Sequence, residues 1–195
     1  MFQQNKIIVF ICIIIYYTGV AQTSHYKISS RNTPVGNLTV IKTENGNLLQ
    51  IEVISEVSIK VFIKVDLKYK LNCTYKDDEL LFSSVTTYVN GKIHTTSKTE
   101  KNGANYTIVR DGHESKFLQK ITYSGALLYF KEPKGITTVY SEFHAIDKPI
   151  KALGNHEYQI TNPKNGLLSE YTYQNGILVT TMNHHSLMPF TLTKI

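Results

Sequence analysis

Two glutamates are the residues whose types and spacing could support catalysis. Glu132 and Glu142 lie in tyrosine-rich, strand-like stretches, and a pair of converging carboxyl groups can perform general acid–base chemistry. Glu142 shares a strand face with Ile136 and Tyr140, and a carboxylate on a buried face needs a polar partner because its desolvation is costly. Converging carboxyls would predict a hydrolase or isomerase, whereas Glu132, which precedes Pro133, could simply be a turn residue.

Tyrosines near these acids suggest a ligand-binding face. Tyr171 and Tyr173 share one face of an expected strand, and Tyr158 shares a face with Ile160. A tyrosine combines an apolar ring with a polar hydroxyl, which suits a barrel mouth or the rim of a core. Packing in the core or at its rim is the competing interpretation. The candidate ligand-face residues are Tyr129, Glu132, Glu142, Tyr158, Tyr171 and Tyr173.

No motif in the sequence indicates a metal, a cofactor or a covalent nucleophile. His184 and His185 would point to opposite faces of a strand, which does not suit one metal ion. Cys73 lies between Leu71 and Tyr75 in an apolar column, which indicates a small buried hydrophobe rather than a reactive thiol. Phosphate loops, nucleophile elbows and zinc-binding helices are absent from the sequence. The sequence therefore assigns no catalytic residue, no cofactor and no metal ligand.

Positive charge is modest and partly concentrated on one strand face. The 195 residues include 21 Lys and Arg against 15 Asp and Glu, and 42% are hydrophobic. This composition excludes disulfide scaffolds, collagen and disordered chains. Lys60, Lys64, Lys68 and Lys70 would face water and blunt a sheet edge, or else bind an anionic surface. Because the aromatic residues lie mainly elsewhere, nucleic acid is not an expected partner.

The first 21 residues set the expected compartment. Lys6 precedes an apolar run over residues 7–17, and small residues follow up to Ala21. This layout predicts a signal peptide over residues 1–21, cleaved after Ala21, and a single domain over 22–195. An uncleaved anchor is the alternative, although the run is shorter than the ~20 residues of a membrane helix. We expect a periplasmic or secreted protein that contacts a membrane only if this segment is retained.

The remainder of the chain is predicted to be all-β, with roughly nine to eleven strands. Runs of β-branched and aromatic residues alternate with turn signals, and no stretch keeps an apolar period of 3.6. The segment Ser124–Phe130 is expected to be a short helical turn or a buried strand, and Ala145–Asn155 an irregular loop. Six dipeptides favour the positive φ of tight turns, namely Asn45-Gly46, Asn90-Gly91, Asn102-Gly103, Asp111-Gly112, Asn165-Gly166 and Asn175-Gly176.

The segment Leu49–Tyr75 has the strongest period-two pattern. Its odd positions are apolar apart from Ser55, and its even positions are mostly polar. A single strand of this length would extend roughly 90 Å, so we expect a bend or a break, at Ser55-Glu56. Long strands favour curvature, and the predicted fold is a single antiparallel, strongly curved sheet or an incomplete β-barrel.

Several short motifs relate the chain to other proteins. The motifs are His25-Tyr26-Lys27-Ile28-Ser29, Val89-Asn90-Gly91-Lys92, Leu128-Tyr129-Phe130-Lys131-Glu132-Pro133, Val139-Tyr140-Ser141-Glu142 and Tyr158-Gln159-Ile160. In these stretches the chain resembles an uncharacterised family of secreted β-proteins, a domain of unknown function, from flavobacteria-like bacteria. The resemblance implies a periplasmic or exported protein and supplies no activity, cofactor or catalytic residue.

Three functions remain open from the sequence. The first is a non-catalytic carrier of an apolar, lipid-like ligand in the bacterial envelope, with the long apolar column lining a concave face. The second is a structural or interaction protein that binds an envelope protein through an exposed patch. The third is a hydrolase or isomerase that uses Glu132 or Glu142. A cavity, a solid core with an exposed patch, and converging carboxyls are the features that would distinguish them.

Overall fold

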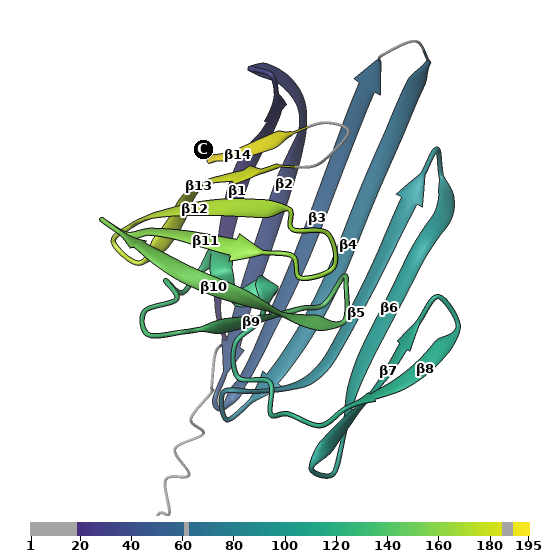
Figure 1. The fold of residues 1–195 in the computed structure, drawn as a ribbon, viewed down its shortest axis with the longest axis vertical. Helices are drawn as coiled ribbons and strands as arrows, with labels where there is room; N and C mark the ends of the chain where they lie inside the picture. Colours follow the sequence, from purple (N-terminus) through teal and green to yellow (C-terminus); the bar gives the residue numbers. More distant parts are fainter. Residues whose placement is uncertain (1–18, 61–62, 185–188) are drawn as a thin grey trace, which may run out of the picture.

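The computed structural model describes residues 19–60, 63–184 and 189–195, and in these ranges the chain forms one antiparallel sheet of 14 strands and one short 3-10 helix (Figure 1). The strand order is β8-β7-β6-β5-β4-β3-β2-β1-β14-β13-β12-β11-β10-β9. The elements are β1 (Val20–Ser30), β2 (Thr33–Asn45), β3 (Leu48–Lys60), β4 (Lys64–Lys76), β5 (Glu79–Val89), β6 (Lys92–Asn102), β7 (Asn105–Arg110), β8 (His113–Phe117), η1 (Gly125–Tyr129), β9 (Thr138–Ser141), β10 (Ile146–Gly154), β11 (Glu157–Thr161), β12 (Leu168–Gln174), β13 (Ile177–Asn183) and β14 (Phe190–Lys194).

The sheet consists of two meanders joined by its first and last strands. β1 pairs with β14 from Tyr26↔Lys194 to Ser29↔Thr191. The C-terminal strands cross over the long N-terminal strands, so the sheet folds back on itself (Figure 1). β8 and β9 are its two edges and do not pair with each other. The prediction of a single, strongly curved, incompletely closed antiparallel sheet is confirmed.

Tight turns explain why the strands outnumber the predicted nine to eleven. Both residues have the expected positive φ in Asn90-Gly91, Asp111-Gly112 and Asn175-Gly176, and the glycine has it in Asn45-Gly46 and Asn102-Gly103. These five of the six signals each join two consecutive paired strands in a tight turn. Three other hairpins use pairs without glycine, in which both residues also have positive φ. Asn and Asp tolerate this conformation because their short side chains bond to the local backbone. These pairs are Arg31-Asn32, Asp77-Asp78 and Asn155-His156.

Of the bend or break expected at Ser55-Glu56, the break is wrong, because β3 is continuous through both residues. Ser55 pairs with Leu38 on one side and Tyr69 on the other, so a single serine is accommodated within the apolar column. The reversal comes later, where Lys60 pairs with Lys64. That part of the sequence contains no Gly, Pro or Asn, and therefore carries no turn signal.

The expected irregular loop over Ala145–Asn155 is also wrong, since most of it forms β10. Pro149 is compatible with this strand because the backbone nitrogen of Ile150 bonds to the Thr137 oxygen, which directs the nitrogen of Pro149 away from β9. The nitrogen of Pro149 therefore points to the side of β10 that pairs with β11, and this pairing begins only at the next residue, Ile150. The proline therefore removes no ladder bond.

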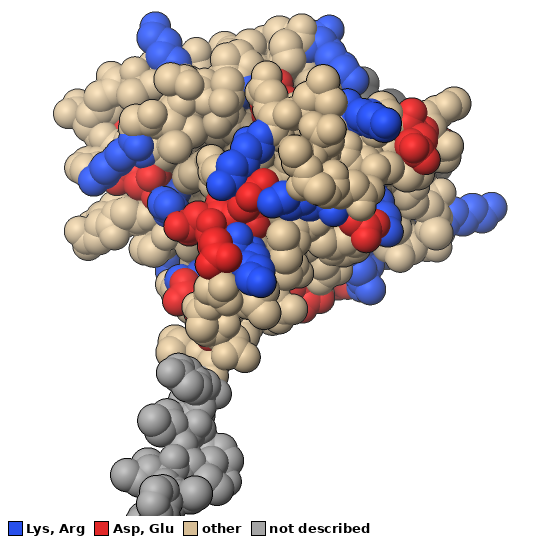
Figure 2. Space-filling view, turned by 90° about the horizontal axis from the view of Figure 1, so that it is seen from below, with Lys and Arg blue, Asp and Glu red and all other residues tan. Residues whose placement is uncertain are grey.

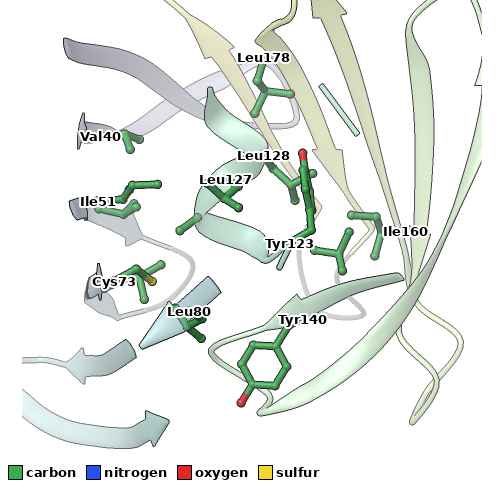
Figure 3. Packing of buried hydrophobic residues seen from close by; sticks show 14 of the residues in the cluster. Val40, Ile51, Cys73, Leu80, Tyr123, Leu127, Leu128, Tyr140, Ile160 and Leu178 are labelled. Carbon is green, nitrogen blue, oxygen red and sulfur yellow. The ribbon is translucent and has the colours of Figure 1, made fainter. Parts of the chain in front are cut away.

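The core lies between the two meanders and encloses η1. Figure 3 shows Leu127 and Leu128 of η1 lying between residues of the N-terminal strands and residues of the C-terminal strands. The segment Ser124–Phe130 is thus a short helical turn, one of the two expected forms. The labelled core residues are Val40, Ile51, Cys73, Leu80, Tyr123, Leu127, Leu128, Tyr140, Ile160 and Leu178.

Both ends of the long apolar column lie in this core, including Leu71 and Cys73 of β4, but its middle does not. Ile51 and Val53 of β3 are buried, whereas Val57 and Ile59 further along the strand are half-buried. β3 and β4 extend past the crossing C-terminal strands in this middle part (Figure 1). The column is therefore partly core and partly an uncovered concave face.

Two of the four predicted lysine positions, Lys64 and Lys68, are paired with carboxylates. Lys68 lies 2.5 Å from Glu56, and Lys64 lies 3.1 Å from Asp66, all on exposed parts of β3 and β4. Basic and acidic side chains are likewise intermixed on the face in Figure 2. Such exposed pairs contribute little stability, but they prevent these two lysines from forming a purely cationic surface.

The N-terminal segment is only partly described. Residues 1–18 of the predicted signal segment lie outside the described residues, and β1 begins at Val20, which pairs with Glu44. In the described ranges, no helix has the length and apolarity needed to cross a membrane. The cleavage after Ala21 stays a prediction.

Candidate functional site

The candidate site is a cavity of about 340 Å³ between η1, β9, β10 and the C-terminal strands. Its apolar wall includes Leu128, Val139, Ile160 and Leu167. The volume is at the lower end of the range for small-molecule sites, about 300–1,000 Å³. A larger depression of about 460 Å³ on the outer sheet surface, near Phe82, is more open and has only a few lining residues. The cavity beside η1 is the more enclosed of the two and therefore the better candidate.

Polar side chains occupy part of the cavity lining. They are uncharged or basic, and no carboxyl group belongs to the described lining. The set contains Ser141, His144, Lys148, Asn162, Asn165, Ser169, Tyr171, Asn183 and His184. A ligand in this position would therefore meet an apolar wall together with hydrogen-bond donors.

The β9–β10 ladder positions the basic part of this lining. Lys148 pairs with Val139 and Ile146 pairs with Ser141, so these side chains share one face. Asp147 pairs with Tyr140 and faces the other way. There the Tyr140 hydroxyl hydrogen-bonds to Thr99 at 2.8 Å, which attaches β9 to the N-terminal meander.

His144 is a neutral member of the lining at pH 7. Burial, together with nearby cations, first among them Lys148, lowers the pKa of its imidazole to about 4. The Nδ1 atom lies 3.2 Å from the hydroxyl of Ser141. A neutral imidazole offers one donor and one acceptor, so His144 can hydrogen-bond to a ligand without contributing charge.

Glu142 lies behind the cavity wall in a fully buried hydrogen-bonded group. Its Oε1 accepts bonds from the Ser124 hydroxyl, from the Ala126 backbone nitrogen at 2.9 Å and from the Cys73 thiol at 3.6 Å. The Tyr75 hydroxyl lies 2.5 Å from Ser124 and extends the group. Burial raises the pKa of Glu142, and this outweighs the opposing effect of the bonds from Ser124 and Ala126. The carboxyl group is therefore biased toward its neutral form.

The predicted burial of Cys73 is confirmed. Burial raises the pKa of its thiol well above the usual range, and the neighbouring Glu142 raises it further. The protonated thiol is a weak donor to Glu142 rather than a nucleophile.

Gly125 allows the Glu142 carboxyl group to lie against the η1 backbone. A Cβ at this position would be 2.7 Å from Glu142 Oε2. We expect Gly125→Ala to lower the free energy of unfolding by about 1–3 kcal/mol, the usual cost of overpacking. Urea denaturation measures this loss. In a Glu142→Ala background the same substitution should cost almost nothing, and an undiminished loss there would contradict a clash with the carboxyl.

Glu132 forms a separate group beneath the β12–β13 turn. Its Oε1 accepts bonds from the Tyr158 hydroxyl at 2.7 Å and from His156 Nδ1 at 2.8 Å, while its backbone nitrogen bonds to Gly176. Its Oε2 lies 3.4 Å from the Lys134 ammonium, a contact that is electrostatic because no hydrogen bond to this oxygen is formed.

The pKa of Glu132 shifts in the direction opposite to that of Glu142. Burial raises the pKa of Glu132, but the hydrogen bonds from Tyr158 and His156, together with the nearby Lys134 ammonium, outweigh burial and hold it below its usual value. Glu132 is therefore an ionised, partnered carboxylate. Among the hydrogen bonds of the described residues, the two glutamates share no partner.

The predicted ligand-face residues separate into three environments. Tyr171 lines the cavity. Tyr173 and Tyr158 pack edge to face with ring centres 5.6 Å apart, and Tyr129 packs on Tyr26 in the core. Glu132 and Glu142 occupy the two groups described above. The structure thus brings one of the six to the cavity.

Sequence reasoning missed the basic part of the site. Lys148 precedes Pro149, and this pair suggested a loop rather than a strand that faces a cavity. Asn162 and Asn183 carried no distinguishing signal. His185 lies outside the described residues, whereas His184 lines the cavity, 3.7 Å from Glu170. In the described part of the chain, no three His, Cys, Asp or Glu side chains cluster so as to hold a metal ion.

Comparison with known proteins gives a family and a fold. Residues 26–194 match the model of a domain of unknown function, DUF6134. No curated protein matches the chain in sequence. The crystal structure of a beta-barrel-like protein of the domain of unknown function DUF1849, from Brucella abortus, superposes with a TM-score of 0.59. The match spans 89% of this chain and 94% of the Brucella protein. Because the two sequences are only 9% identical, the likeness concerns the fold alone.

Proposed function

Because the chain belongs to the DUF6134 family, a domain of unknown function, we propose a function from its own geometry: it binds a small, mainly apolar ligand without catalysing a reaction. The observation that carries this proposal is the cavity of about 340 Å³, with its apolar wall and partly polar lining. Pockets of this kind are the usual binding sites for small molecules. The expected lining by the column Val57–Leu71 is replaced by residues of η1, β9, β10 and the C-terminal strands.

Binding agrees better with this geometry than catalysis does. Catalysis by Glu132 and Glu142 would need both groups near one reacting atom, but neither belongs to the lining contributed by the described residues. Glu132 and Glu142 are each held by their own hydrogen-bond partners. An interaction protein that uses the uncovered part of β3 and β4 is the alternative, and it would leave the cavity without a role.

The compartment is part of the same proposal. The signal-like residues 1–21 support export, so the ligand would be bound in the periplasm or outside the cell. The sequence motifs support an origin in flavobacteria-like bacteria. A carrier in the bacterial envelope is the role that combines these expectations with the cavity.

Filling the cavity tests the proposal. Ser169 lines it from β12, whereas Thr172 lies on the opposite strand face. We expect the wild type to bind the neutral fluorophore N-phenyl-1-naphthylamine, and Ser169→Phe to weaken its affinity at least tenfold by occupying the space. Thr172→Phe is the matched control and should bind as the wild type does.

Fluorescence titration measures both affinities, and native mass spectrometry of the purified protein detects any retained ligand. Equal binding by Ser169→Phe and the wild type would place the fluorophore elsewhere and contradict the proposal, as would absence of binding by the wild type.

A further inference from the structure

Lys148 is a half-buried cation at the cavity with no anionic partner of its own. It lines the cavity from β10, and it forms no salt bridge within the described part of the chain. By contrast, several lysines on exposed strand faces have carboxylates within about 3 Å, for example Lys64 with Asp66 and Lys98 with Glu100. A buried charge is unfavourable unless it is paired.

The surrounding acids cannot serve as that partner. Asp147 is adjacent in sequence but lies on the opposite face of β10. Burial lowers the pKa of the Lys148 ammonium, and the nearby Glu142 opposes this only in part, so that the net shift is downward. Glu142 Oε1 already accepts three bonds, and burial biases the group toward its neutral form. Lys148 is therefore left without a full counter-charge.

Neighbouring groups favour an anion at the same place. The described lining contains donors such as the amides of Asn162 and Asn183 and the hydroxyl of Ser169, and it contains no carboxylate that would repel an anion. Hydrogen bonds between an ammonium and an anionic oxygen are about twice as strong as neutral ones. The apolar wall would hold the remaining, uncharged part of the ligand.

From these features we propose that the ligand is an amphiphile with one anionic head, a carboxylate or a phosphate monoester, that pairs with Lys148 while its hydrocarbon part occupies the apolar wall. This inference rests on the proposed function and specifies the ligand class. It requires that the cavity prefer an anionic amphiphile to a neutral one with the same chain.

Matched ligands test the charge separately from the cavity. Isothermal titration at pH 7 compares decanoate, decyl phosphate and decanol, which share a hydrocarbon chain. We expect the wild type to bind one or both anions at least tenfold more tightly than decanol, and the comparison of the two anions identifies the head group. Lys148→Met, which keeps an unbranched stem, should lose this preference for the anions over decanol.

Two further variants control for side-chain shape and overall charge. Lys148→Arg keeps the charge and should keep the preference for the anion. Lys151→Met removes an exposed lysine of the same strand and should bind all three ligands as the wild type does. Unchanged binding of the anions by Lys148→Met, or equal binding of decanol and the anions by the wild type, would overturn the inference and leave the proposed cavity function standing. Failure of the wild type to bind any of the three would overturn both.

Discussion

Replacing Glu142 by leucine is expected to lower the free energy of unfolding by about 3–4 kcal/mol at pH 7. The substitution would leave the Ser124 hydroxyl and the Ala126 backbone N–H buried without an acceptor. Each buried donor that loses its partner costs about 1–3 kcal/mol. Urea denaturation measures the loss. Glu142→Gln keeps a carbonyl acceptor of nearly the same shape and should cost far less, so equal losses for the two variants would show that the hydrogen bonds are not what stabilises this region.

The difference in stability between Glu142→Gln and the wild type is expected to depend on pH, with a defined sign. The folded-state pKa of Glu142 is raised above its ordinary value of 4.5, so the folded protein holds this proton more tightly than the unfolded chain. Its contribution to stability is fully present below pH 4.5 and is lost as the pH rises toward the folded-state pKa. The stability of Glu142→Gln relative to the wild type should therefore increase with pH above 4.5.

This measurement separates Glu142 from Glu132. The pKa of Glu132 is lowered, so its contribution is present above its ordinary pKa and is lost as the pH falls. Because Glu132 is the same in both proteins, its effect cancels in the difference between them. A constant difference from pH 4 to pH 8 would contradict the raised pKa of Glu142.

Replacing Tyr26 by alanine is expected to cost about 3–5 kcal/mol, the usual range for a fully buried aromatic side chain. Tyr26 is 0% exposed. Its ring packs on Tyr129 of η1, and its hydroxyl donates to the Leu178 oxygen of β13 at 3.0 Å. One side chain thus connects the first strand, the central helix and the C-terminal meander.

Tyr26→Phe separates the two contributions. It removes the hydroxyl and leaves the Leu178 oxygen without this donor, for which we expect a loss of about 1 kcal/mol. Denaturant midpoints of the two variants provide the comparison. A loss for phenylalanine as large as that for alanine would assign the stabilisation to the hydrogen bond rather than to ring packing.

The sequence predicts those parts of the fold that depend on local chemistry. Asn90-Gly91 and Asn175-Gly176 adopt the positive φ that their residue types favour, and the alternation in β3 correctly identifies its core face. Hairpins such as Asp77-Asp78 were missed because the same backbone is reached there without glycine. The break assigned to Ser55 fails because its strand neighbours, which are distant in sequence, tolerate a serine.

The candidate site is less predictable because it depends on contacts between distant segments. Glu142 was correctly expected to need a partner if buried, but its partners Cys73 and Ser124 come from β4 and the start of η1. Lys148 faces the cavity through its register in the β9–β10 ladder, where it pairs with Val139. No local pattern encodes either arrangement.

The pairing of β1 with β14 also has a consequence for how the protein folds. Both free edges of the sheet, β8 and β9, come from the middle of the chain, while the two end strands are adjacent within the sheet. If the chain were joined at its two ends and cut instead between Phe117 and Thr138, consecutive strands would be neighbours throughout the sheet, as in a single meander. In the natural order each half can assemble from local hairpins, but the seam between the halves must close across nearly the whole polypeptide, the slowest kind of contact to form. The sheet is therefore complete only after the last strand has been released from the ribosome, or from the export channel if the protein is secreted.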